Sequence, residues 1–354
     1  MHIDKLTLIR ISTIFIGFFS NLANAQSPKL ILGEDGKEGW SGTTGTYILA
    51  GEGKSFLNSI NEEGDQIIDS LSDEPSDYDF ATMYPTLRIN YSISNTSHVS
   101  LGVFDTGVTS NSLIETQSLV ALSFYHTFSN DSIMWMSIAP NIPGLYQVWQ
   151  DPYKTGSVLE KTDASLNVFS LGSDYIMGSP ISISASLGEQ KVENDHAGQS
   201  FHSRINQRPL NNKQISSLRR DTTFGTLRAS LTHSLAEGLY IEGGVSYFQS
   251  DAAGNTNKFS SISIDLGLVY TFEGLDFYMS GDINSAKFDY IHPIFESKRE
   301  DDNYNLSLGF SYKEPFNWDS TSFEVFVGTY NTVSNINFYD EESIIFATGF
   351  SYDF

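Results

Sequence analysis

The sequence predicts an all-β fold: a single antiparallel up-and-down barrel that crosses a membrane with about 14 strands. Three observations support this prediction. Apolar and polar residues alternate along many segments of strand length, the connections between these segments alternate between short and long, and the chain ends in an alternating aromatic segment. Barrels of twelve or sixteen strands are the alternatives.

The alternation is clearest over residues 262–272. Ile262, Ile264 and Leu266 alternate there with Ser263 and Asp265. Successive side chains of a strand point to opposite faces, so one face of each strand lies in an apolar medium and the other in a polar one. The same rule, applied to the whole chain, predicts fourteen strands that span approximately 40–51, 80–93, 98–106, 115–128, 132–141, 162–176, 180–190, 223–235, 238–250, 258–272, 275–287, 302–312, 321–332 and 343–354.

The polar faces of these strands indicate which side points outward. A soluble sandwich or barrel would bury its apolar face and expose lysine and glutamate. The residues between the apolar ones are instead small, as at Ser182, Ser184 and Ser186. Small neutral side chains suit a crowded or water-filled interior, so the apolar faces are predicted to contact lipid and the serine-rich faces to line the barrel.

The predicted connections differ in length in a regular way. The short ones span 94–97, 129–132, 177–179, 236–238, 273–274 and 313–320. Most of the others are long, at 52–79, 142–161, 191–222, 288–301 and 333–342, whereas those near 107–114 and 251–257 are shorter. Short periplasmic turns at one end and long external loops at the other are typical of membrane barrels.

The first 25 residues are predicted to be a cleaved signal peptide. Lys5 and Arg10 supply positive charge, residues 11–19 form a short apolar run, and Ala23-Asn24-Ala25 has the pattern of a cleavage site. The alternative is a buried N-terminal helix. We therefore expect three regions: the signal peptide (1–25), a short periplasmic segment (26–39) and the barrel (40–354).

The last strand carries the most specific motif. Phe350, Tyr352 and the terminal Phe354 share one face. This segment resembles the C-terminal β-signal of bacterial outer-membrane proteins. The resemblance implies residence in the outer membrane of a Gram-negative bacterium, insertion by the outer-membrane assembly machinery, and lipid and lipopolysaccharide as neighbours. The opening Gly39-Trp40-Ser41-Gly42, followed by Lys54-Ser55, is similar to an uncharacterised barrel family of marine γ-proteobacteria, which implies no particular activity.

Composition excludes several classes of function. The chain has 43 acidic and 20 basic residues, a formal net charge of −23, and no cysteine. A nucleic-acid-binding protein needs a basic surface. A disulfide scaffold or a thiolate zinc site needs cysteine. We expect no nucleic-acid partner, no cofactor and no metal.

The register predicts which side chains line the interior. Fourteen strands leave a lumen too wide for wall side chains alone to fill. Arg88 and Arg228 should lie on nearly opposite walls, where arginine and carboxylate groups would set up a field across a pore. The alternative is that these charges pair and brace the wall. The candidate pore-lining residues are Arg88, Asn90, Arg228, Tyr240, Glu242, Asp265, Asp276, Tyr278, Asp282 and Glu324.

Two long loops carry opposite charge. The first, 52–79, holds nine carboxylates and one lysine, and either collects divalent cations or is a solvated surface. The loop 191–222 has a basic excess and is predicted either to constrict the pore or to contact lipopolysaccharide phosphates. Its candidate contact residues are Arg204, Arg208, Lys213, Arg219 and Arg220.

The predicted function is a passive outer-membrane channel for small hydrophilic solutes. The first alternative is a closed barrel that acts through its external loops as an adhesin or surface receptor. The second is a lipid- or peptide-hydrolysing barrel, but Ser123 and His126 stand at an odd spacing that sends them to opposite faces. No nucleophile–base arrangement is evident, so we expect no enzymatic activity.

Overall fold

The computed structural model describes residues 38–59, 67–104, 119–142, 146–201 and 209–354. The predicted signal peptide lies outside these residues. No helix within the described ranges is long and apolar enough to span a membrane.

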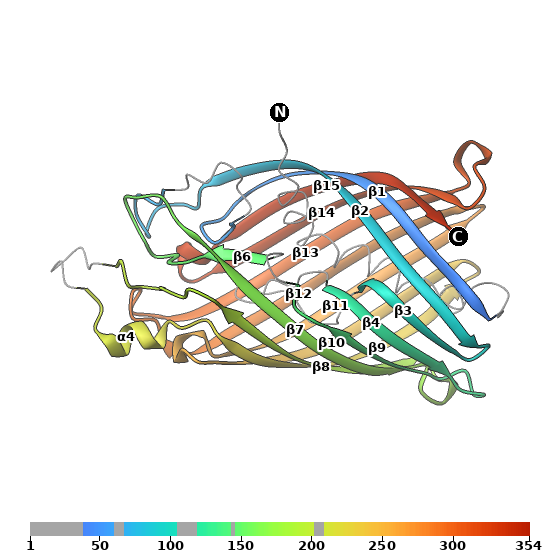
Figure 1. Cartoon of the computed structure of the whole chain (residues 1–354), viewed down its shortest axis with the longest axis horizontal. Helices are drawn as coiled ribbons and strands as arrows, with labels where there is room; N and C mark the ends of the chain where they lie inside the picture. Colours follow the sequence, from blue (N-terminus) through green and yellow to red (C-terminus); the bar gives the residue numbers. More distant parts are fainter. Residues whose placement is uncertain (1–37, 60–66, 105–118, 143–145, 202–208) are drawn as a thin grey trace.

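The described residues form one closed antiparallel barrel (Figure 1). Each wall strand pairs with its neighbours, and the last strand pairs with the first. The predicted fourteen-strand barrel is confirmed. Its wall strands are β1 (Gly39–Lys54), β2 (Asp77–Ser94), β3 (Ser97–Phe104), β4 (Leu119–Thr127), β5 (Ile133–Ala139), β7 (Lys161–Asp174), β8 (Ile181–Val192), β9 (Thr222–Ala236), β10 (Leu239–Ala252), β11 (Phe259–Phe272), β12 (Leu275–Ile291), β13 (Lys298–Lys313), β14 (Thr321–Ser334) and β15 (Glu341–Asp353).

The structure contains one strand that the sequence did not predict. The short strand β6 (Tyr146–Trp149) pairs with β7 beyond the point where β5 ends, inside a segment predicted to be a loop. Four residues are too few for alternation to be recognised. Strands β12 and β13 also extend further along the barrel axis, toward the end with the longer loops, than predicted. Their connection is therefore shortened to 292–297.

The helical segments within the described residues lie in the connections. They are α4 (Asn212–Ser217) and the 3₁₀ turns η1 (Ile176–Gly178), η2 (Asn255–Asn257), η3 (Pro315–Asn317) and η4 (Asn337–Tyr339). The side chain of Asn211 caps α4 by accepting hydrogen bonds from the N–H groups of Lys213 and Gln214. The C-terminus lies at the end with tight turns, and α4 lies at the opposite end with the longer loops (Figure 1).

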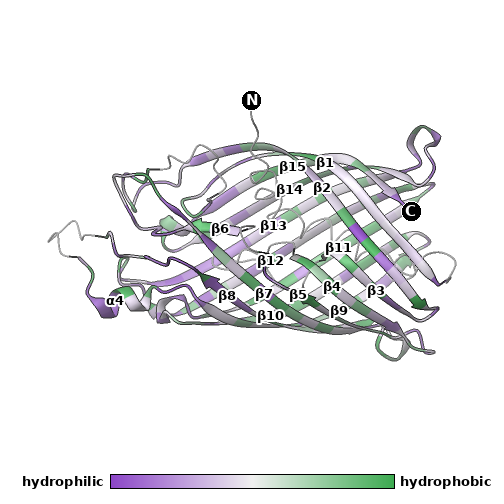
Figure 2. Ribbon diagram, viewed as in Figure 1, coloured by the Kyte–Doolittle hydropathy of each residue, from purple (hydrophilic) through white to green (hydrophobic). Residues whose placement is uncertain are grey.

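The two faces of the wall are oriented as predicted. On β11, Ile262 and Ile264 are 57% and 65% exposed, whereas Ser261 and Ser263 are 2% exposed. Apolar and polar residues alternate along the strands, and α4 lies in a hydrophilic region (Figure 2). The apolar faces therefore form the lipid-contacting wall, and the serine-rich faces point inward.

The inner wall also carries stacked phenylalanine rings that were not predicted from the sequence. Phe224, Phe248, Phe259 and Phe288 come from the neighbouring strands β9 to β12. Their ring centroids are separated in turn by 5.5, 5.3 and 4.8 Å. Each ring occupies an inward position in line with buried polar or small residues, as Phe248 does between Ser246 and Ser250, so alternation alone did not reveal these rings.

Candidate functional site in the barrel lumen

A charged cluster occupies the inner wall of β9, β10 and β11. The Arg228 Nη2 lies 3.1 Å from Glu242 Oε1 and 2.6 Å from Asp265 Oδ2. These side chains are between 24% and 34% exposed, so they are accessible from the lumen. The pairing reaches across β10 to a strand that is not adjacent to the strand carrying Arg228.

Glycine makes this reach possible. Gly244 on β10 pairs in register with Asp265, and its side-chain position lies between the two charged groups. A Cβ atom at Gly244 would stand 2.6 Å from Arg228 Nη2 and 2.7 Å from Asp265 Oδ1, closer than van der Waals contact. The lack of a side chain at this position therefore lets Arg228 cross the strand and contact Asp265.

The next strand adds further negative charge. Asp282 on β12 stands directly opposite Asp265 on the same face. Like charges in this position repel each other. Asn305 on β13 donates to both carboxylate oxygens of Asp282, at 3.0 and 3.2 Å, and Arg228 offsets the charge of Asp265. The cluster thus holds three carboxylates, those of Glu242, Asp265 and Asp282, and one guanidinium, so it is net negative.

Arg88 lies far from this cluster. It is on the inner face of β2, opposite Thr43 and Gly102 of the neighbouring strands. Counted round the barrel, β2 is six strands from β9 one way and eight the other, so the two arginines lie on nearly opposite walls. On the same face as Arg88, Asn90 accepts a short hydrogen bond from Ser100.

The remaining predicted pore-lining residues also occupy inward register positions. Lys313 Nζ lies 3.2 Å from Asp276 Oδ2. Glu324 accepts from the Tyr47 hydroxyl at 3.1 Å and from Ser351 Oγ at 2.7 Å. Tyr278 is buried beside Gly309, and Tyr240 is 43% exposed. The ion pair of Asp276 and the two hydrogen bonds of Glu324 are made with residues outside the Arg228 cluster.

The basic loop residues do not act as one group. Arg220 is held inside the protein, with Nη2 2.7 Å from Asp195 Oδ1 and with donation to the carbonyl groups of Trp149 and Gln150. Lys213 and Arg219 are exposed on the external side. Arg204 and Arg208 lie outside the described residues. Arg220 is therefore a structural brace within the loops.

The external loops build an apolar core of their own, which we call the cap cluster. The cluster was not predicted from the sequence, although aromatic residues inside predicted loops were an available signal. Its buried members are Phe56, Ile68, Trp149, Tyr153, Leu159, Ala197, Leu210, Leu218, Ile336, Phe338 and Tyr339. Part of the loop 191–222 packs into this cluster through Ala197, Leu210 and Leu218.

The cap cluster bridges the outer mouth. Tyr153 lies between β6 and β7, and its hydroxyl lies 3.1 Å from Nε2 of His292, which is in the β12–β13 connection. Between these two places lie four wall strands on one side (β8, β9, β10 and β11) and six on the other (β4, β3, β2, β1, β15 and β14). Connections from nearly opposite walls therefore meet over the lumen.

No group of three or more potential metal ligands occurs in the part of the chain that the structure describes. Of the acidic first loop, Glu62, Glu63 and Asp65 lie outside the described residues. The described carboxylates Glu52 and Glu74 are exposed.

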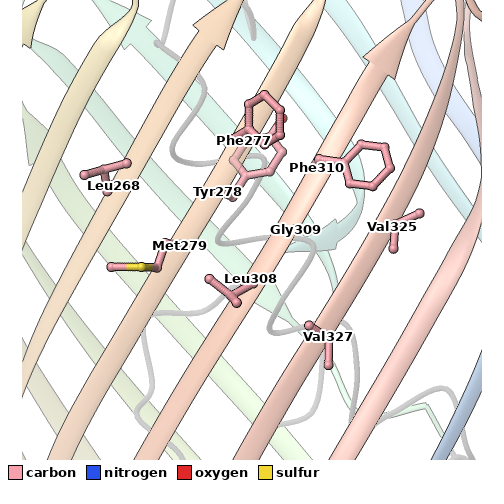
Figure 3. A pocket seen from close by; sticks show the side chains of 9 residues that line it. All are labelled: Leu268, Phe277, Tyr278, Met279, Leu308, Gly309, Phe310, Val325 and Val327. Atoms are coloured by element: carbon pink, nitrogen blue, oxygen red, sulfur yellow. The ribbon is translucent and has the colours of Figure 1, made fainter.

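A shallow hollow of about 400 Å³ lies on the outer wall (Figure 3). It is lined by side chains of β11 to β14, among them Leu268, Met279, Leu308 and Val325. These residues occupy the apolar, outward register positions. The hollow therefore belongs to the membrane-contacting surface and not to the lumen.

The closed antiparallel barrel, apolar outside and polar inside, places the protein among β-barrel proteins of the outer-membrane type. Residues 39–353 match the family described as "Protein of unknown function (DUF2860)", and the chain belongs to this family. None of the curated proteins matches the chain.

Solved outer-membrane proteins resemble the chain at low identity. Outer-membrane-expressed OmpT of Vibrio cholerae is 10% identical, with 88% of this chain and 98% of that chain covered and a TM-score of 0.44. The anion-selective porin from Comamonas acidovorans is 9% identical, with 90% and 99% covered and a TM-score of 0.38. The channel DcaP of Acinetobacter baumannii is 11% identical, with 89% and 98% covered and a TM-score of 0.43.

Proposed function

We propose that the protein is a passive channel for small hydrophilic solutes that prefers cations. The observation that carries this proposal is the net negative cluster of Glu242, Asp265, Asp282 and Arg228 on the inner wall. Carboxylates that face a confined aqueous space raise the local concentration of cations and lower that of anions.

Three contacts support the direction of this preference. The positive charge of Arg228 is shared by two carboxylates, whereas Asp282 is held by the neutral amide of Asn305. The interpretation in which Arg228 braces the wall is therefore compatible with a cation preference, because the bracing leaves an excess of negative charge.

Planar bilayer recordings test the proposal. The purified barrel should show discrete conductance steps, and a salt gradient should give a reversal potential of the sign expected for cation preference. Changing Asp265→Asn and Asp282→Asn together should move this potential toward zero. Asp302→Asn is the matched control, because Asp302 lies on the outward face of β13 and is exposed. A folded protein that never conducts would contradict the channel.

The cap cluster favours a second candidate function. A barrel whose mouth is bridged by packed loops could act through those loops as an adhesin or surface receptor. Lys213 and Arg219 are exposed there and could contact lipopolysaccharide phosphates. This candidate predicts binding to lipopolysaccharide that weakens in the Lys213→Ala/Arg219→Ala variant, together with no conductance at any voltage.

We propose no enzymatic reaction. Ser123 is buried on the inward face of β4, whereas His126 occupies the opposite face, where its Nδ1 lies 2.8 Å from Ser97 Oγ. A hydrolysing barrel would instead show turnover of a lipid or peptide substrate that is lost on changing a single histidine.

A further inference from the structure

The cap cluster encloses a polar centre. His292, Tyr153 and Tyr339 are between 1% and 4% exposed. The Nε2 of His292 lies 3.1 Å from each tyrosine hydroxyl, and the two hydroxyls lie 2.8 Å apart. Three connections of the barrel therefore meet at one imidazole: the β6–β7 segment, the β12–β13 connection and η4.

The hydrogen bonds define the protonation state of this imidazole. The N–H of Ile294 points at Nδ1 of His292 over 3.3 Å, so Nδ1 accepts and carries no proton. The proton of the neutral ring therefore resides on Nε2, whose single N–H is shared between the two tyrosine hydroxyls. In the closed cap Nδ1 must accept a hydrogen bond, because the Ile294 N–H points at it.

Charged groups surround the centre on the barrel side. The guanidinium carbon of Arg299 lies 3.5 Å from the ring centroid of Tyr339. Arg299 pairs with Asp301 at 2.7 Å, and both side chains are almost fully buried. At the start of β15, Glu341 accepts from Ser55 at 2.7 Å. Arg299 thus links the Tyr339 ring to Asp301, and its charge also acts on Glu341 and on His292.

We propose that the cap is an acid-sensitive closure, in which protonation of His292 at Nδ1 separates the connections that Tyr153 and Tyr339 hold together over the mouth. The proposal goes beyond the proposed function, because it concerns the loops and does not depend on whether solutes pass. The second proton would point a ring N–H at the Ile294 N–H, which breaks that hydrogen bond. It would also place a positive charge in a dry site near Arg299.

The direction of the pH effect follows from linkage. Burial, with a further contribution from Arg299, lowers the pKa of His292 from its ordinary 6.5 to about 3. A solvated His292 in an opened cap binds a proton below pH 6.5, whereas the closed cap does not. The ratio of opened to closed cap therefore rises about tenfold for each pH unit below that value, and this gain ends near the lower pKa.

Hydrogen–deuterium exchange of the cap tests this directly. In the full-length protein, backbone exchange in residues 151–159 and 336–340, corrected for intrinsic rates, should rise about tenfold from pH 6 to pH 5. Exchange in the wall strands should not change. His292→Asn should remove the response, because the Asn carbonyl still accepts from Ile294 but does not titrate. His196→Asn is the matched control, since His196 is exposed in a neighbouring loop.

The outcomes separate this proposal from its rivals. An acid response that persists in His292→Asn would overturn it and point to Glu341. If that variant does not fold, exchange at the imidazole C2 hydrogen of the unchanged protein reports protonation of His292, and an ordinary pKa there would also overturn it. Acid-loosened loops without conductance would contradict the channel alone, and conductance with a pH-independent cap would contradict this inference alone.

Discussion

Arg228 contacts Asp265 at 2.6 Å across the intervening strand β10, above the backbone of Gly244. The pair joins β9 to β11 on the inner wall, so it depends on three strands having the correct register. It also defines the part of the lumen in which carboxylates outnumber cations.

Substituting Gly244 tests this contact. Gly244→Val should displace the Arg228 guanidinium and destabilise the barrel by about 1–3 kcal/mol, the usual range for adding methyl groups to a packed site. Urea unfolding in detergent measures the difference. Gly243→Ala is the control, because a Cβ there meets only ordinary contacts at 3.8 and 3.9 Å. Equal stabilities for the two variants would contradict the account of Gly244.

Removing the Arg228 guanidinium should clearly change the ion selectivity of the channel and only modestly lower the stability of the barrel. In Arg228→Gln, Glu242 and Asp265 lose their shared counterion, so cation preference should increase. The stability loss should be about 1–2 kcal/mol, between the values for exposed and fully buried pairs. The reversal potential in a salt gradient measures the first effect and urea unfolding the second. A shift toward anions would show that this cluster does not face the conducting path.

Substitutions where β1 pairs with β15 should impair assembly of the barrel. Gly42 and Phe354 exchange two backbone hydrogen bonds, at 2.8 and 2.9 Å, and the Phe354 ring covers the space beside Gly42. Gly42→Leu should displace this ring and reduce the folded fraction in the membrane, as should Phe354→Ala. The shift in gel mobility between folded and heat-denatured protein measures that fraction. Gly267→Ala, which has open space around its Cβ position, should assemble normally.

The cap cluster should unfold independently of the barrel wall. Phe338 is 1% exposed and packs against Phe56 and Phe295. Phe338→Ala should cost about 3–5 kcal/mol within the cap cluster. Proteases added from outside should then cut the loops faster, while the thermal unfolding of the strands stays nearly unchanged. A matching fall in the unfolding temperature of the wall would show that cap and barrel unfold as one unit.

Local alternation was sufficient to predict the wall. The alternation of Ile262, Ile264 and Leu266 with Ser261 and Ser263 identifies both the strand and its outward face. This works because odd and even positions along a strand point to opposite sides of the wall. The fourteen strands and the alternation of short and long connections follow from the same signal. Strand ends were less accurate, since β12 and β13 remain paired beyond the apolar segments that mark them.

The site was predictable only as a set of inward positions. Parity placed Arg228, Glu242, Asp265 and Asp282 on the inner face. It carried no information on their pairing, which depends on the register of β9, β10 and β11 and on the space at Gly244. The cap cluster was not predicted, because Phe56, Tyr153 and Phe338 lie in loops without a repeating pattern.

The sequence by itself determined which side of each strand meets lipid, how many strands cross the membrane and at which end the long loops lie. Only the tertiary structure decided that Arg228 reaches Asp265 and that Tyr153 meets His292 over the mouth. The physical reason is the separation along the chain of the residues that interact. The side of a strand is set by the parity of each residue along the chain, whereas contacts between distant strands and loops depend on register and packing that no local pattern records.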